Sequence, residues 1–114
     1  MSDVSAFIQN GATVRITAAA TPPSAVQAPA NFTTGPRPRN QYRVVNSGAV
    51  PAFLGAGATA AAAAANAAVV SSSGNGIPLL PGATEVFSVP YDWYFTCATA
   101  SSTAEVYITP GEGL

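Results

Sequence analysis

The sequence predicts an all-β fold: an antiparallel β-sandwich, jelly-roll-like, or a small barrel, with about seven or eight strands. Short stretches in which polar and apolar residues alternate recur along the chain, as at 84–89 and 103–109. Gly, Pro, Asn and Ser separate these stretches, and no segment has the clear apolar spacing of an amphipathic helix. The 114 residues suit a single domain, 1–114.

The N-terminal segment predicts a strand that follows either a hairpin partner or an arm. Residues 13–17 alternate, which places Val14 and Ile16 on one face of the strand. Asn10 and Gly11 precede this strand and form a strong turn signal. Residues 1–12 are therefore expected to form the first half of a hairpin or an extended N-terminal arm that reaches a neighbouring subunit.

A long Pro-rich loop is expected at residues 21–40. Prolines at positions 22, 23, 29, 36 and 38 exclude a helix and disfavour a central strand. Residues 35–39 would be stiff, polyproline-like and positively charged, so Arg37 and Arg39 would suit contact with an acidic neighbouring surface. The alternative is a solvated connection that only joins two sheets.

The middle of the chain predicts two strands and one ambiguous segment. Residues 41–48 form a strand closed by a turn, and the strand at 50–55 lies at a sheet edge or begins after Pro51, which has no N–H for a ladder. Residues 60–65 are consecutive alanines, the best helix formers. The run is shorter than the ~12–15 residues of a marginal isolated helix, so we favour a closely packed strand over a short helix. Residues 71–76 then form a surface loop.

Three strands are predicted in the last third of the chain, at residues 84–89, 93–97 and 103–109. Pro110 is expected to end the last of them. Cys97 lies in the second strand, among aromatic residues. A lone thiol in such a strand is expected to be buried and to act as a small hydrophobic side chain.

The aromatic cluster at residues 91–95 is the richest candidate for an interaction site. Alternation sends Tyr91, Trp93 and Phe95 to one face of the strand and Tyr94 to the other. One face is expected to pack in the core. A ring on the emerging face would anchor an interface or stack on a sugar, so Tyr91, Trp93 and Tyr94 are candidate interface residues.

Charge and composition argue against several functional classes. The chain has 4 Lys plus Arg, 5 Asp plus Glu and no His, and its net charge is -1. So few cations argue against a nucleic-acid partner, and the absence of a long unbroken apolar run argues against a membrane. Without His or Lys to act as a base, and with scattered carboxylates, we expect neither enzyme activity nor a metal ion or other cofactor. The low charge indicates either a Ser/Thr/Gly-rich surface or one covered by other subunits, as in a homo-oligomer.

From about residue 40 to its end, the chain resembles small virion proteins of bacteriophages. The likeness lies in Tyr-Arg-Val-Val-Asn-Ser-Gly at 42–48, Pro-Ala-Phe-Leu-Gly at 51–55, Pro-Leu-Leu-Pro-Gly at 78–82, Glu-Val-Phe at 85–87, and Ser-Thr-Ala-Glu-Val-Tyr-Ile-Thr-Pro-Gly-Glu-Gly at 102–113. Residues 1–39 add nothing to it. These motifs are moderately specific as a set and weak singly, because each alone is a strand followed by a turn.

The resemblance implies a head-decoration (cement) protein or another accessory capsid or tail component. Such a protein would be made in the host cytoplasm, would lie on the capsid surface of the virion, and would have the major capsid protein as its partner. A tail or neck component is the alternative in the same class. In another class, a carbohydrate-binding β-sandwich module could use the aromatic cluster at residues 91–95.

Overall fold

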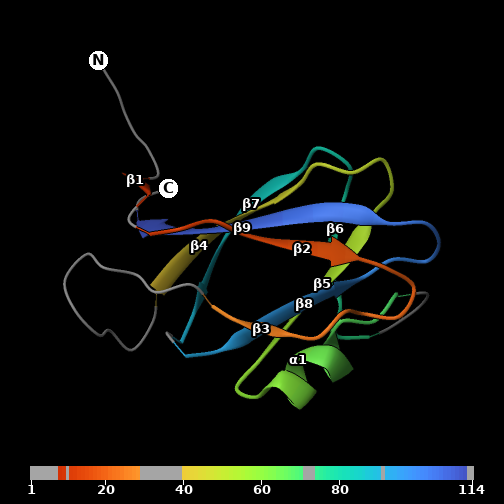
Figure 1. Cartoon of the computed structure of the whole chain (residues 1–114), viewed down its shortest axis with the longest axis horizontal. Helices are drawn as coiled ribbons and strands as arrows, with labels where there is room; N and C mark the ends of the chain where they lie inside the picture. Colours follow the sequence, from red (N-terminus) through yellow and green to blue (C-terminus); the bar gives the residue numbers. More distant parts are fainter. Residues whose placement is uncertain (1–7, 10, 29–39, 71–73, 91, 113–114) are drawn as a thin grey trace.

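Strands form where side chains alternate between buried and exposed positions, and in the computed structural model they build two antiparallel sheets packed face to face (Figure 1). The structure describes residues 8–9, 11–28, 40–70, 74–90 and 92–112. Sheet A contains β1 (Ile8–Gln9), β2 (Val14–Ala18), β4 (Asn40–Asn46), β7 (Thr84–Val89) and β9 (Ala104–Glu112). Sheet B contains β3 (Val26–Gln27), β5 (Ala52–Gly57), β6 (Ile77–Leu79) and β8 (Tyr94–Ala98). The predicted antiparallel sandwich is confirmed, and within these residues the sheets do not close into the alternative barrel.

The central strand pair of each sheet, β9-β4 in sheet A and β8-β5 in sheet B, joins segments that are distant along the chain. The order in sheet A is β1-β9-β4-β7, with β2 also paired to β9, and the order in sheet B is β3-β8-β5-β6. β5 begins at the residue after Pro51, which confirms the predicted start of that strand. It lies between β8 and β6 and is therefore not an edge strand.

The N-terminal hairpin is not formed. Gln9 of β1 pairs with Gly111, and Val14 of β2 pairs with Ile108. Both segments lie on the same side of β9, because β4 occupies the other side. The turn signal in the sequence therefore corresponds to an interruption in one edge strand. Residues 1–7, the rest of the expected arm, lie outside the described residues.

β9 continues through Pro110 to Glu112, so the prediction that this proline ends the strand is wrong. Pro110 pairs with Tyr42 of β4 on one side. On its other side it is level with the interruption between β1 and β2, where no described residue is in register with it. A residue without a backbone N–H is tolerated at such a break in a ladder.

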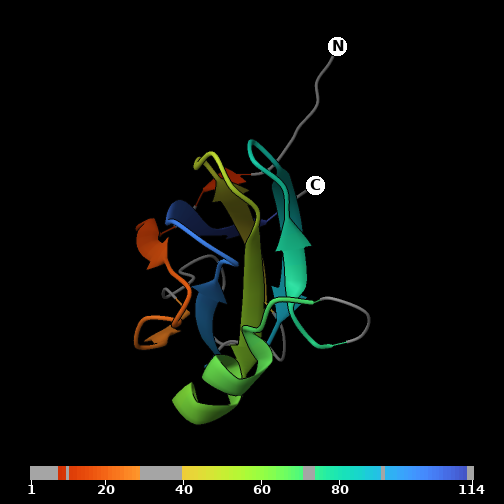
Figure 2. The ribbon, with the colours of Figure 1, turned by 90° about the vertical axis from the view of Figure 1, so that its right-hand side faces the viewer.

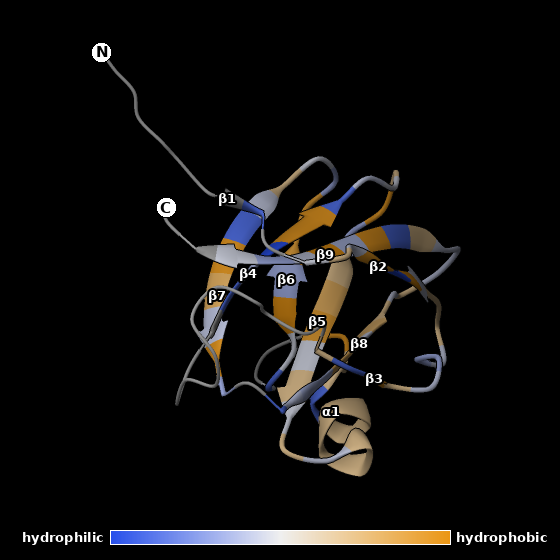
Figure 3. Cartoon of the chain, turned by 60° about the vertical axis from the view of Figure 1, so that its left-hand side comes forward, coloured by the Kyte–Doolittle hydropathy of each residue, from blue (hydrophilic) through white to orange (hydrophobic). Residues whose placement is uncertain are grey.

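The core lies between the sheets and is formed by their inward-facing side chains. It contains Ile16, Ala18, Tyr42, Val44, Val106 and Ile108 from sheet A, and Ala52, Leu54, Leu79, Phe95 and Cys97 from sheet B. The rings of Tyr42 and Phe95 meet edge to face with their centroids 5.7 Å apart. Cys97 is fully buried, which confirms the prediction. Figure 3 shows the alternation of hydropathy along β9.

The alanine run forms a helix, α1 (Ala60–Asn66), and not the strand favoured from the sequence. The Oγ1 of Thr59 accepts a hydrogen bond from the Ala62 N–H at 3.1 Å and so caps the first turn. At the other end, the Asn66 side chain donates to the Ala56 carbonyl of β5 at 2.9 Å. Contacts with the sheet therefore stabilise a helix that is too short to persist alone.

α1 lies directly on the backbone of β5, because that strand has glycines where the helix crosses it (Figures 1 and 2). A Cβ on Gly55 would lie 2.2 Å from the Ala67 nitrogen, and one on Gly57 would lie 2.6 Å from the Ala62 Cβ. The alanine run therefore packs closely on a neighbouring sheet, as expected, but as a helix.

Asn46 joins the end of β4 to sheet B. Its buried side chain donates to the carbonyls of Val50 and Leu79 at 3.0 Å and 2.8 Å, and it accepts from the Gly48 N–H at 2.9 Å. Both amide hydrogens and the carbonyl oxygen are thus bonded, so the burial of this polar group is compensated.

The segment expected to be one Pro-rich loop contains β3, which pairs Val26 with Phe95 at an edge of sheet B. The prediction of a continuous loop over 21–40 is therefore wrong at this strand. The segment before β3 is fixed to sheet B, because the hydroxyl of the buried Thr96 donates to the Pro23 carbonyl at 2.8 Å. Residues 29–39 lie outside the described residues.

Candidate interaction surfaces

The structure describes two of the five candidate interface residues. Trp93 lies just before β8 and Tyr94 is its first residue, and both are half-buried. Tyr94 lies on the opposite face from the buried Phe95, as alternation predicts, whereas Trp93 precedes the strand. Half-burial favours packing over an exposed ring for these two. The other three candidates lie outside the described residues: Arg37, Arg39 and Tyr91.

The outward side of sheet A presents large polar and apolar side chains together. We call Arg15, Arg43, Val45, Val86 and Tyr107 the sheet A face. Tyr107 pairs with Arg15 on one side and with Val45 on the other, and Arg43 pairs with Val86. The two arginines are exposed, and the other three residues are half-buried. α1 lies on the opposite side of the sandwich (Figures 1 and 2).

The sheet A face carries a positive charge on a chain whose net charge is -1. Both arginines in the described part of the chain belong to it, and one carboxylate, Glu105, lies beside Arg15 on the same side of the sheet. The Nε of Arg15 is 3.5 Å from Glu105 Oε1, and the Thr17 hydroxyl donates to the same oxygen at 2.8 Å. An exposed ion pair of this kind contributes about 1 kcal/mol or less to stability, so Arg15 can exchange this contact for one with a partner.

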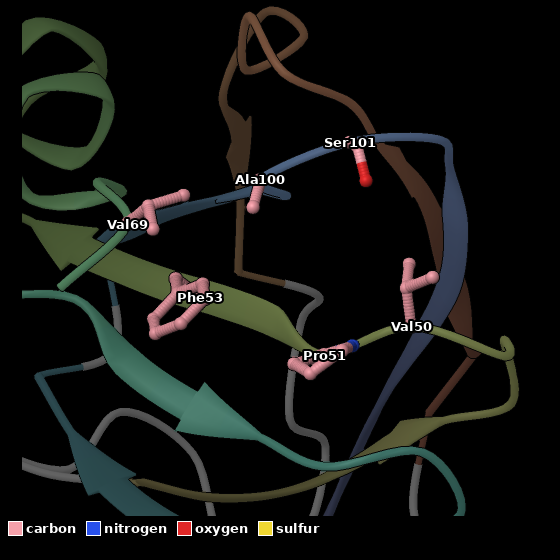
Figure 4. A pocket seen from close by; sticks show the side chains of 6 residues that line it. All are labelled: Val50, Pro51, Phe53, Val69, Ala100 and Ser101. Atoms are coloured by element: carbon pink, nitrogen blue, oxygen red, sulfur yellow. The ribbon is translucent and has the colours of Figure 1, made fainter. Parts of the chain in front are cut away.

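The outward side of sheet B is covered by α1 over only part of its area. Phe53 lies on the same side of β5 as Gly55 and Gly57, and beyond the helix it forms the floor of a shallow groove (Figure 4). The groove has a volume of about 220 Å³. Its lining, which we call the apolar groove, consists of Val50, Pro51, Phe53, Val69, Ala100 and Ser101.

Two of the exposed large apolar side chains in the described ranges, Val69 and Leu80, lie at this groove. Val69, which is 42% exposed, lines it; Ile77, at 38%, lies in β6; and Leu80, at 63%, directly follows β6. β6 is adjacent to the groove because Pro78 pairs with Phe53. Ile77 pairs with the buried Leu54 and therefore lies on the core-facing side of β6, whereas Val69 and Leu80 make the surface at the groove apolar, as at many interaction sites.

Sequence reasoning missed this groove. Its lining comes from three segments that are distant along the chain, at 50–53, 69 and 100–101. The available signal was the alternation of Phe53, Gly55 and Gly57, which gives one face of a strand a bulky side chain followed by two absent ones. A helix can pack on the two glycines, and a hollow then remains beyond the end of the helix, over the bulky residue.

The sheet edges are poor templates for strand addition. β3 has two residues, β6 has three including Pro78, and the edge formed by β1 and β2 is interrupted. β7 is the longest edge in the described part of the molecule, and Glu85 pairs with the buried Val44 on its core-facing side. Short strands, proline and inward charges protect edges from pairing. Binding is therefore expected to use the faces of the sheets.

The ionisable groups of the described segments form no cluster of three or more His, Cys, Asp or Glu that could hold a metal ion. Burial raises the pKa of the Cys97 thiol to about 12, because desolvation disfavours the thiolate. The thiol is therefore protonated and shielded at neutral pH. None of the helical residues described here makes a helix long and apolar enough to cross a membrane.

Comparison with known protein families, with curated proteins and with solved structures finds no match for this chain.

Proposed function

We propose that this chain is a structural protein of a bacteriophage virion, which binds the outside of the capsid and stabilises it by bridging major capsid subunits. The likeness of residues 40–114 to phage virion proteins supports this function. The observation that carries it is the sheet A face, a sheet surface that no described helix covers and on which the two described arginines lie next to a tyrosine.

The sheet A face has the composition of a protein-binding surface. Tyr107 lies beside Arg15, and Arg43 lies diagonally across the ladder from it. Arginine and tyrosine dominate many interfaces, because a planar guanidinium can bond a carboxylate at two points and a ring buries a large area at low entropic cost. A matching capsid surface presents carboxylates or backbone carbonyl oxygens.

Bridging stabilises a shell by mass action. A subunit that contacts two capsid subunits binds the assembled shell and not its separated parts, so its binding free energy opposes disassembly. This effect requires contact area at two places and no chemical reaction. Contacts made through a preformed sheet face lose little conformational entropy on binding.

A tail or neck component would use the same face elsewhere on the particle. It is the alternative if the chain is part of the virion but absent from the head shell. A carbohydrate-binding module would need exposed rings in the aromatic cluster, and the half-burial of Trp93 and Tyr94 does not favour it.

Co-sedimentation with capsids tests the proposal. Expanded capsids are assembled without this chain from the major capsid protein encoded in the same genome, and are mixed with the purified protein. We expect binding that saturates at a fixed ratio to the major capsid protein and raises the temperature at which the capsids break. The double variant Arg15→Glu, Arg43→Glu should bind about tenfold more weakly or worse.

Glu85→Gln is a control for a smaller charge change elsewhere, because Glu85 is exposed on β7 and lies outside the sheet A face. It should bind as the wild type does, and circular dichroism should show that all three proteins are folded. If the wild type neither sediments with capsids nor occurs in purified particles, the function is wrong. If it occurs in particles only with tails, the tail or neck alternative replaces it.

A further inference from the structure

We propose that the apolar groove is a self-association site, in which two copies pair about a two-fold axis and each inserts Leu80 into the groove of the other. This inference goes beyond the capsid proposal and does not depend on it, because it concerns the protein alone.

One surface carries both halves of the contact. The apolar groove is a hollow of about 220 Å³ with Phe53 at its floor and Ser101 at its rim (Figure 4). Leu80 is the most exposed large hydrophobic residue of the described part, at 63%. It follows the pair between Ala52 and Leu79, which places it level with Pro51 at the other rim. A projecting leucine beside a hollow is self-complementary when the surface is rotated by a two-fold axis.

Leu80 is held in a defined position by a tight turn. The Ala83 N–H donates to the Leu80 carbonyl at 2.9 Å, and Gly82 between them has a φ of 80°, which favours glycine. The Gly82 N–H also donates to the Asn46 carbonyl at 2.8 Å. Because the turn is fixed before binding, the leucine loses little backbone freedom when it is inserted.

The charge of the patch fits a second copy of the same surface. The groove lining is apolar except for Ser101, and the exposed Leu80 lies beside it. On a two-fold axis each patch faces itself, so a charged patch would meet like charges, and this one meets none. A strongly charged partner would have to desolvate its charges against apolar surface, which is unfavourable.

The contact depends on side chains and not on a continuous sheet. β6 lies beside the groove, but it has three residues and contains Pro78, which cannot donate to a new ladder. Insertion of Leu80 into the hollow above Phe53 is therefore the central contact. Because the interface is symmetric, one substitution changes it twice.

Sedimentation velocity over a concentration series tests the pairing. We expect a reversible dimer for the wild type, and Leu80→Asp should raise its dissociation constant at least about thirtyfold, as for the loss of a central interface residue. Thr84→Asp is the matched control, since it adds the same charge at an exposed position of sheet A and should leave the dimer unchanged. Thermal melting should show that both variants are folded, because neither residue is buried.

Cross-linking tests the predicted neighbours directly. Under mild oxidation, a mixture of Leu80→Cys and Ser101→Cys proteins should give more covalent dimer than either variant alone, while a mixture of Thr84→Cys and Ser101→Cys should not. The buried Cys97 does not interfere. A wild type that stays monomeric up to about 1 mM, which corresponds to an association free energy weaker than about -4 kcal/mol, would overturn the inference. A dimer that is insensitive to Leu80→Asp, or cross-linking without the predicted preference, would overturn it too.

Discussion

On the outward side of sheet B, β5 presents Gly55 and Gly57, whereas on the outward side of sheet A, β4 presents Arg43 and Val45. The two strands have the same alternation, but only the first has no side chains where a helix could cross. α1 therefore packs on the backbone of sheet B, and no helix in the described residues covers the outward side of sheet A. The size of the outward side chains therefore decides which face a short helix can cover, and which face is left for a partner.

The largest effect is expected at the contact between α1 and β5. Gly55→Ala adds a Cβ that would lie 2.2 Å from the Ala67 nitrogen and 2.5 Å from the Ala63 carbonyl oxygen, both of which are backbone atoms. The helix must move away, so we expect a loss of about 3 kcal/mol or more in the free energy of unfolding. Urea denaturation measures it.

Gly74→Ala is the control for this substitution. A Cβ there meets only the Val70 Cγ2, at the ordinary distance of 3.4 Å. We expect a change within about 0.5 kcal/mol, or a slight gain from reduced freedom of the unfolded chain. Equal stability of the two variants would mean that α1 does not rest on Gly55.

The next largest loss of stability is expected from the Asn46 side chain, whose hydrogen bonds join the end of β4 to sheet B. Asn46→Leu leaves the carbonyls of Val50 and Leu79 without their amide donor, and the second of these bonds is buried. We expect a loss of about 2–3 kcal/mol in unfolding free energy, since unsatisfied buried groups lose their hydration without compensation. Asn75→Ala removes one exposed side-chain bond, to Asn66 at 3.2 Å, and should cost less than about 0.5 kcal/mol. A similar loss of unfolding free energy in both variants would argue that the Asn46 hydrogen bonds do not stabilise the contact between the sheets.

The buried thiol of sheet B predicts a pH dependence. The pKa of Cys97 is raised from 9.0 to about 12 in the folded chain, so folding is unaffected by this group below pH 9. As the pH rises from 9 toward 12, the unfolded thiol loses its proton while the folded one keeps it. Stability should therefore fall by up to about 1.4 kcal/mol per pH unit.

Denaturation of the wild type and of Cys97→Ala between pH 8 and 10.5 isolates the contribution of Cys97 to the pH dependence of stability, because the other titrating groups are common to both proteins. The wild type should lose stability more steeply above pH 9. Parallel curves would show that Cys97 is accessible to water in the folded chain.

The smallest effect on stability is expected on the sheet A face. Arg15→Gln removes an ion pair whose side chains are 62% and 38% exposed, and Glu105 keeps its hydrogen bond from Thr17. We expect a change below about 0.5 kcal/mol in unfolding free energy. A loss well above this value would show that the open face stabilises the fold and is not free for recognition.

Much of the fold could be predicted from the sequence, because alternation and turn residues are local signals. Residues 84–89 form β7 as expected, and Cys97 is buried. The helix at 60–66 was missed because its stability comes from contacts with β5 and not from its length. Pro110 was misjudged because the break that accommodates it lies in β1 and β2, about a hundred residues earlier in the chain.

The candidate surfaces were less predictable than the fold. The apolar groove joins segments that only the tertiary structure brings together, so no local pattern marks it. The sheet A face depends on register, which places Arg15 beside Tyr107 through pairing of the two ends of the chain. The half-buried Trp93 and Tyr94 show that an aromatic cluster alone does not separate packing from recognition.

A cryo-EM map of virions that contain this chain tests most directly whether the sheet A face and the apolar groove are its binding surfaces. We predict density for the sandwich at fixed lattice positions outside the head shell. The sheet A face should lie against major capsid subunits, and the apolar groove should face Leu80 of a second copy. A map that has the chain on the shell with its sheet A face in solvent, or that has no density for it on the shell, would contradict the proposal.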